Sequence, residues 1–153
     1  MRPALLPLTV TLATALVAAG CSDATDDYCA ALTDEKATLE RLSQRADDPA
    51  TGALSDSVDV FEGLRDAAPE DLRDEWTTYV IAWQGLESAL ARAGVDAGVF
   101  TDGGRPDGVT DAELDAVRDA ADKMRSQPVV DAAGGIEQHA TDVCGVDLGG
   151  SGL

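Results

Sequence analysis

The feature that most constrains the fold is a long apolar stripe in the middle of the chain. It consists of Leu72, Trp76, Tyr79, Val80, Trp83, Leu86, Leu90 and Ala93. Most neighbours in this series are three or four residues apart, which places them on one face of an α-helix. Gly94 follows directly and is typical of the residue just after a helix. We therefore expect a long helix here, at the centre of the fold.

The aromatic residues of this stripe allow two interpretations. Trp76, Tyr79 and Trp83, with Phe100 from the next segment, could form a ligand or partner surface. Two indoles and a phenol at helical spacing are more often part of a hydrophobic core. The spacing favours the core.

Four further segments have helical periodicity and indicate an all-α fold. Their apolar positions are Tyr28, Leu32, Leu39 and Leu42; Leu54, Val58, Phe61 and Leu64; Leu114, Val117, Ala121 and Met124; and Val130, Ala133, Ile136, Ala140 and Val143. Pro69 and Pro128 each predict a break between two helices. We expect the two helices on either side of one of these prolines to act as a single bent unit. Gly134 and Gly135 weaken the last helix.

The connection from Gly94 to Val109 is long and rich in glycine. A compact helical domain seldom needs so many irregular residues, so we expect this loop to be functional or mobile.

The segment after this loop permits a metal site or a helix cap. Asp102, Asp107, Asp111 and Glu113 are the candidate calcium ligands, because they partly match an EF-hand loop. Their spacing does not place both the glycine and the closing glutamate of such a loop correctly. Thr110 and Glu113 instead fit a capping box that starts a helix. We therefore predict a cap, and neither a metal ion nor another cofactor.

The N-terminus carries the marks of an export signal. Arg2 is followed by an apolar run from Ala4 to Ala19, small residues at 18–20, and Cys21. A run of 16 residues is short for crossing a bilayer, which takes about 20. The segment Leu16 to Cys21 resembles the lipobox of bacterial lipoproteins processed by signal peptidase II. The resemblance implies cleavage after Gly20 and a diacylglyceryl group on Cys21.

The number of cysteines agrees with this and predicts a disulfide. With Cys21 acylated, Cys29 and Cys144 remain as an even pair in an oxidising compartment. Their bond would join the two ends of the domain, which gives a four- to five-helix antiparallel bundle closed by one disulfide. The expected divisions are a signal peptide (1–20), a lipidated tether (21–27), a helical bundle (28–145) and a flexible tail (146–153).

Charge and composition exclude several functions. The formal net charge is −18, and it becomes −19 once residues 1–20 with Arg2 are removed (−18 − 1). Nucleic acids and anionic lipids would be repelled, so we expect no nucleic-acid partner. His139 is the only histidine, and patterns typical of nucleophiles, zinc or nucleotide sites are absent. We expect a protein that is not an enzyme.

The whole chain resembles the small, Ala- and Asp-rich lipoproteins of actinobacterial envelopes. The resemblance rests on the lipobox, on Tyr28-Cys29-Ala30 and on Cys144-Gly145-Val146. It implies export and anchoring of Cys21 at the outer face of the cytoplasmic membrane, but no established activity. Our leading hypothesis is a non-enzymatic helical module that acts through contacts with an envelope protein. The alternative function is binding of a small solute or a cation such as Ca²⁺ by the 94–109 loop.

Overall fold

The protein is an all-α bundle in the part of the chain that the computed structural model describes, residues 21–45, 52–100 and 106–148. Side chains are described except at 21–23, 45 and 100. The elements are α1 (Cys21–Arg45), α2 (Ala53–Ala67), the 3₁₀ turn η1 (Glu70–Leu72), α3 (Arg73–Ala93), the 3₁₀ turn η2 (Ala97–Phe100), α4 (Asp111–Met124) and α5 (Gln127–Asp142). The predicted fold class is confirmed.

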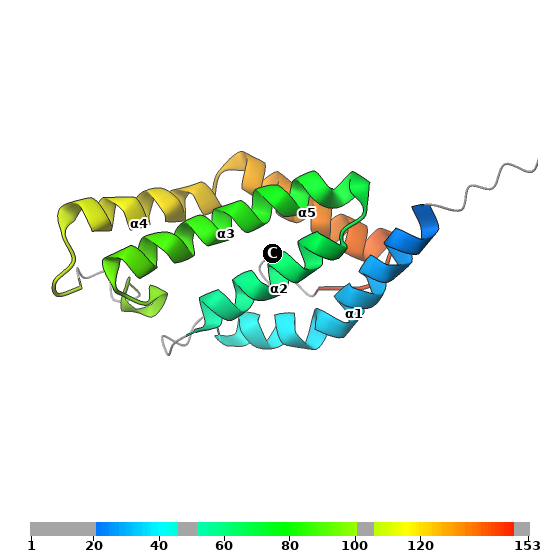
Figure 1. Cartoon of the computed structure of the whole chain (residues 1–153), viewed down its shortest axis with the longest axis horizontal. Helices are drawn as coiled ribbons and strands as arrows, with labels where there is room; N and C mark the ends of the chain where they lie inside the picture. Colours follow the sequence, from blue (N-terminus) through cyan, green and yellow to red (C-terminus); the bar gives the residue numbers. More distant parts are fainter. Residues whose placement is uncertain (1–20, 46–51, 101–105, 149–153) are drawn as a thin grey trace, which may run out of the picture.

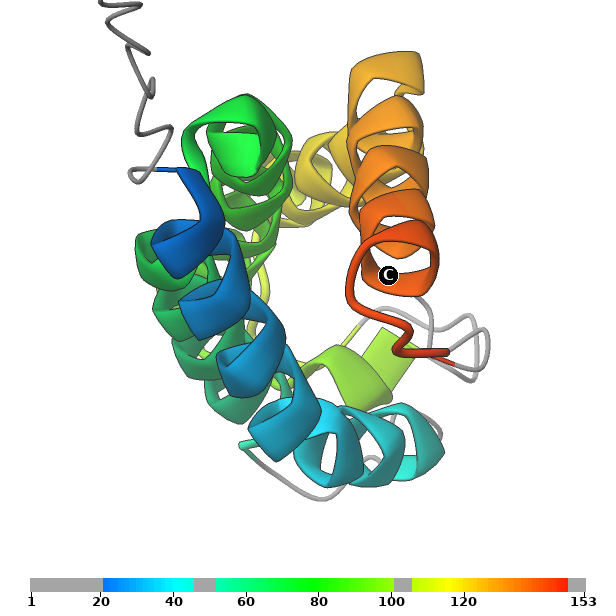
Figure 2. The ribbon, with the colours of Figure 1, turned by 90° about the vertical axis from the view of Figure 1, so that its right-hand side faces the viewer.

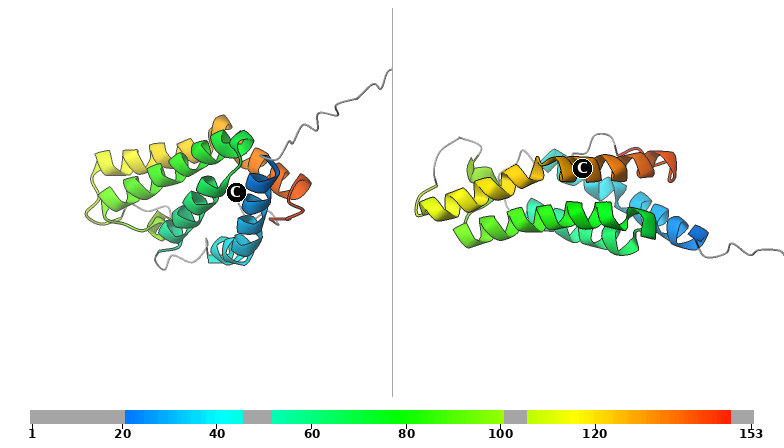
Figure 3. Two further views of the ribbon diagram at one scale, coloured as in Figure 1. Left: turned by 45° about the vertical axis from the view of Figure 1, so that its right-hand side comes forward. Right: turned by 90° about the horizontal axis from the view of Figure 1, so that it is seen from above.

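The arrangement centres on α3. One side of α3 carries α2, which in turn packs against α1, and the other side carries α4 and α5 (Figure 1). α4 and α5 run along α3 one after the other and touch each other little (Figure 3). The sequence left open which of the two prolines lies within the bent pair of helices. The pair is α4 and α5, with Pro128 in the first turn of α5.

The main core takes its buried residues from α1, α2, α3, α5 and the adjoining segments, and Met124 at the end of α4 packs against it. Its largest fully buried side chains are Trp76, Tyr28, Tyr79, Leu32, Leu64, Ile136 and Val80. A smaller cluster of Ala89, Leu90 and Val117 packs α3 against α4 farther along. Full burial of one large apolar side chain contributes about 1.5–3 kcal/mol, so these two clusters hold the helices together.

The C-terminal end of α3 forms as its sequence predicts. Gly94 has φ 66°, a left-handed conformation that glycine adopts without steric cost. The Gly94 N–H donates to the Ala91 carbonyl and the Val95 N–H to the Leu90 carbonyl, each at 3.2 Å. This pair of bonds is a Schellman motif, which satisfies carbonyls that the last turn leaves open.

Two of the expected divisions need correction. Residues 21–27, expected as a tether ahead of the bundle, are already part of α1, which begins at Cys21. The tail was expected to be flexible from 146 onward, but Val146 and Leu148 are only 8% and 5% exposed and belong to the main core. Apolar side chains at these two positions can reach the core because Gly145 turns the chain back at φ 65°. The rest of the expected tail, 149–153, lies outside the described residues.

The helix glycines of α5 have different surroundings. A Cβ at Gly134 would meet nothing within 4 Å, whereas one at Gly135 would lie 3.2 Å from Cγ of Glu75 on α3. Gly135 therefore makes room for the Glu75 side chain, which explains one of the two glycines. Oxygen Oε2 of Glu75 is buried without a hydrogen-bond partner.

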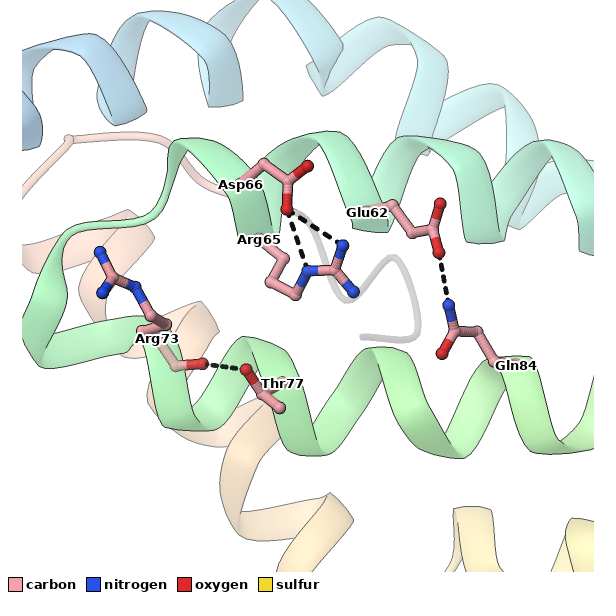
Figure 4. A network of polar contacts seen from close by, with 6 residues as sticks. All are labelled: Glu62, Arg65, Asp66, Arg73, Thr77 and Gln84. Carbon is pink, nitrogen blue, oxygen red and sulfur yellow. Dashed lines mark hydrogen bonds and ion pairs between the residues drawn. The ribbon is translucent and has the colours of Figure 1, made fainter.

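Figure 4 shows polar contacts along α2 and α3, one of which joins the two helices. The Gln84 side-chain amide donates to the Glu62 carboxylate across the two helices. Arg65 instead donates to its own neighbour, with Nη2 3.0 Å from Oδ1 of Asp66. On α3 the Thr77 hydroxyl donates to the Arg73 carbonyl at 2.7 Å. These contacts fix side chains on the surface, where such pairs contribute little to stability.

Candidate functional site

The predicted disulfide is present at one end of the bundle. Cys29 lies in the third turn of α1 and Cys144 just after α5, with their Cα atoms 5.1 Å apart. Both residues are half-buried. Lys36 on α1 donates to the carbonyl of Asp147, which adds a second contact between α1 and the C-terminal segment. Figure 2 looks along the molecule onto this end.

A buried polar contact supports this end from within. The Trp76 indole N–H donates to the Tyr28 hydroxyl at 3.0 Å, and Tyr28 is fully buried. Burial raises the pKa of Tyr28 to about 12, against a smaller lowering effect of the bond from Trp76. A buried hydroxyl without a partner would be costly, so this bond allows the phenol to lie in the core.

His139 packs against the same phenol. Its ring meets Tyr28 edge to face with centroids 5.6 Å apart, and its Nδ1 is buried without a hydrogen-bond partner. Within the described ranges, no three His, Cys, Asp or Glu residues are placed to hold a metal ion. The role that the structure supports for His139 is packing at the closed end.

The aromatic residues proposed as a ligand or partner surface lie in the core instead. Trp76 and Tyr79 are 0% and 2% exposed, and Trp83 is partly buried. Phe61 of α2 contacts the rings of all three, at centroid distances of 6.3, 5.1 and 5.3 Å. The Phe100 side chain falls outside the described residues. The core interpretation favoured by the spacing therefore holds for Trp76, Tyr79 and Trp83, because α2 packs on the aromatic face of α3.

Burial also shifts the pKa of Tyr79. Desolvation raises the pKa of its hydroxyl well above the ordinary value, and the charge of Glu137 adds a smaller effect in the same direction. A phenol with a raised pKa is neutral at physiological pH. Tyr79 is therefore suited to packing and not to acid–base chemistry.

Of the residues considered for calcium, Glu113 belongs to a helix cap. The Thr110 N–H and hydroxyl donate to Oε2 of Glu113 at 2.8 and 2.7 Å, and the Glu113 N–H donates to the Thr110 hydroxyl at 3.3 Å. The bond from the Thr110 N–H has the largest effect on the pKa of Glu113, followed by the bond from the Thr110 hydroxyl, and both lower it. Asp107 and Asp111 are exposed, and Asp102 falls outside the described residues. The predicted capping box is confirmed, and it occupies the carboxylate that a calcium site would need.

The loop that was expected to be irregular contains a turn of helix. η2 occupies Ala97–Phe100 within the Gly94–Val109 connection, and Val109 is buried at its end. Residues 101–105 lie outside the description.

Sequence reasoning missed a surface groove between α1 and α2. It has a volume of about 370 Å³ and is lined by Thr38, Arg41, Leu42, Gln44, Asp56, Asp59 and Val60. A volume of this size suits a small molecule. The residues carry no motif, so only the way α1 packs on α2 brings them together.

Comparison of the chain with known proteins found no relative. No protein-family model, curated protein or solved structure matches this chain. Among the described helices, none combines the length and the apolar character needed to pass through a bilayer.

Proposed function

We propose that this chain is a lipid-anchored helical module at the outer face of the cytoplasmic membrane. Its anchor is a diacylglyceryl group on Cys21, and it acts through contacts with another envelope protein and not as an enzyme. The observation that carries the proposal is the cysteine pairing. Cys29 and Cys144 are bonded to each other, so Cys21 is the one cysteine of the chain left over. It is the last residue of the lipobox-like segment Leu16 to Cys21.

The start of α1 supports a close attachment to the membrane. The seven residues Cys21 to Asp27 are helical and rise only about 10 Å, whereas an extended chain of this length would span over 20 Å. Two acyl chains suffice for stable anchoring, so no membrane-spanning helix is required.

The exposed surface offers a partner many charged groups and only scattered large apolar ones. The large apolar residues that are exposed, Ile81, Val99, Val130 and Val143, lie on several different elements. Phe61 of α2 packs against Trp76, Tyr79 and Trp83, so a ligand site on the 94–109 loop would have to form without these aromatic residues. A partner would meet a surface rich in carboxylates, so we expect it to present a basic face.

The anchor is tested by following acylation of the expressed full-length protein. Radiolabelled palmitate should be incorporated into the wild type and into a Cys29→Ser/Cys144→Ser double variant, but not into Cys21→Ser. Mass spectrometry of the mature N-terminus should place the lipid on Cys21. Labelling that persists in Cys21→Ser would refute the anchor.

The partner is tested by photocrosslinking in native membranes, with a probe at Ala30 on α1 or Asp119 on α4, both exposed. One reproducible protein adduct that disappears with Cys21→Ala supports an anchored interaction module. Diffuse or purely lipid adducts from both positions contradict it.

A further inference from the structure

The groove between α1 and α2 combines an apolar floor with charged walls. Leu42 is 9% exposed and Val60 is partly buried, so both can offer apolar surface inside the groove. Arg41 and Gln44 line it from α1, and Asp56 and Asp59 from α2. Concave sites with an apolar lining and few polar groups are typical of small-molecule binding.

Arg41 is held in place by its own helix. Its Nε–H donates to the Ala37 carbonyl and its Nη2 to the Thr38 hydroxyl, each at 3.1 Å. A guanidinium has five N–H donors, so three remain for a ligand. The fixed side chain loses little conformational freedom when a ligand binds.

Arg41 also differs from other arginines of the bundle in its partners. Arg65, Arg118 and Arg125 each pair with a carboxylate one or three residues away, at 3.0, 3.4 and 2.7 Å. The two bonds of Arg41 go to uncharged oxygens.

Asp59 supplies the opposite charge in the same groove. Within the described residues, its carboxylate has no hydrogen bond or ion pair, and Arg41 has no carboxylate within ion-pair distance. The groove therefore holds one cation, Arg41, and two carboxylates, Asp56 and Asp59, and Arg41 and Asp59 are not paired with each other. A molecule with both charges could satisfy each of them through charge-assisted bonds.

We propose that this groove binds a small dipolar molecule of the amino-acid class. Its carboxylate meets the free N–H groups of Arg41, its ammonium group meets Asp59, and its carbon chain lies over Leu42 and Val60. This site is separate from the anchor on Cys21, so it goes beyond the membrane role proposed above. It also replaces the 94–109 loop as the place where a solute would bind.

The proposal is tested by NMR titration of the ¹⁵N-labelled mature, lipidated protein in nanodiscs. The probes are glycine, 4-aminobutanoate and 6-aminohexanoate, which differ in the separation of their charges, with butylamine and butanoate as single-charge controls. At least one dipolar probe should shift the amides around Arg41 and Asp59 and bind at least about tenfold more tightly than either control, because it makes one more charged contact.

Matched variants locate the site. Arg41→Gln and Asp59→Asn should each weaken binding of that probe about tenfold, whereas Arg118→Gln on α4 should leave it unchanged. All three side chains are exposed, so the fold should be kept, as circular dichroism can verify. The proposal is overturned if no dipolar probe shifts α1 or α2 at millimolar concentration, if butylamine binds as tightly, or if the two groove variants bind as the wild type does.

Discussion

At the scale of single residues, the polar groups of the core decide how the closed end is held. Tyr28 and Trp76 bring a hydroxyl and an indole N–H into the interior, where each satisfies the other at 3.0 Å. The pair links the start of α1 to the start of α3, two segments far apart in the sequence. This bond therefore fixes the register between these helices as well as satisfying two polar groups.

The first prediction concerns this bond. Tyr28→Phe keeps the ring but leaves the Trp76 N–H buried without an acceptor, so the free energy of unfolding should fall by about 1–3 kcal/mol. Urea unfolding followed by circular dichroism at neutral pH measures the loss. The matched control is Val130→Ala, which truncates a 52% exposed side chain and should change stability little. A Tyr28→Phe variant as stable as the wild type would show that the bond contributes nothing.

The second prediction follows from the raised pKa values of both tyrosines. The chain contains only Tyr28 and Tyr79, so tyrosinate absorbance reports on these two groups alone. The folded protein should resist ionisation above pH 10, with Tyr28 titrating near 12, while the urea-unfolded chain should titrate near 10. Identical titrations in both states would contradict the burial of these hydroxyls.

The stability consequence has a definite sign. Above pH 10 the unfolded state loses phenolic protons that the folded state keeps, so the free energy of unfolding should fall as pH rises from 10 to 12. The contribution of these groups is complete below pH 10. Each phenol adds a slope of at most about 1.4 kcal/mol per pH unit. Tyr28→Phe should have a shallower decline than the wild type.

At the scale of elements, the sequence predicted the helices better than their surroundings. The period of apolar residues, Gly94 and the Thr110 capping box were sufficient because they act within one helix. The partner of each face depends on packing between helices. The sequence therefore could not tell that α2 covers Trp83, nor that Arg41 and Asp59 share a groove.

The two glycines of α5 give the third prediction, at this scale. Gly134→Ala meets open space and should stabilise the protein by about 0.5–1 kcal/mol, because alanine is the better helix former. Gly135→Ala should gain less or destabilise, since its Cβ would approach Cγ of Glu75 at 3.2 Å. Thermal and urea unfolding of the two variants provide the comparison.

Repeating the substitution in a Glu75→Ala protein separates the steric contact with Glu75 from the effect of helix propensity. In a Glu75→Ala protein the obstructing Cγ is gone, so Gly135→Ala should stabilise about as much as Gly134→Ala does. If Gly135→Ala is equally stabilising with and without Glu75, the contact between α3 and α5 does not limit this position.

At the scale of the whole molecule, the disulfide closes nearly the entire domain. Cys29 and Cys144 are 115 residues apart in sequence. On the loop-entropy model, a closed loop of this size stabilises by about 4.7 kcal/mol, and measured values are often lower.

The fourth prediction is that Cys29→Ser and Cys144→Ser lower the free energy of unfolding by similar amounts. The double variant should be no less stable than either single variant, as urea unfolding without reductant would show. Additive losses would mean that each cysteine acts alone.

The last prediction joins the fold to the proposed anchor. α1 begins at Cys21, and the bond between Tyr28 and Trp76 places the start of α3 beside the first turns of α1. α3 then runs 21 residues, or about 30 Å, toward its far end (Figure 1). If Cys21 carries the lipid, the η1 end of the bundle faces the membrane and the Ala93 end points away.

A quencher in the lipid headgroups can measure this orientation. Fluorescent non-natural amino acids at Asp71 in η1 and at Arg92 in α3 occupy exposed positions at the two ends. In vesicles carrying the lipidated protein, the probe at 71 should be quenched more strongly than the probe at 92. A flexible Gly-Ser linker inserted after Asp23 should reduce the difference, because the helix would no longer start at the anchor. Equal quenching without the linker, in a protein shown to be acylated on Cys21, would mean that α1 does not hold the bundle upright.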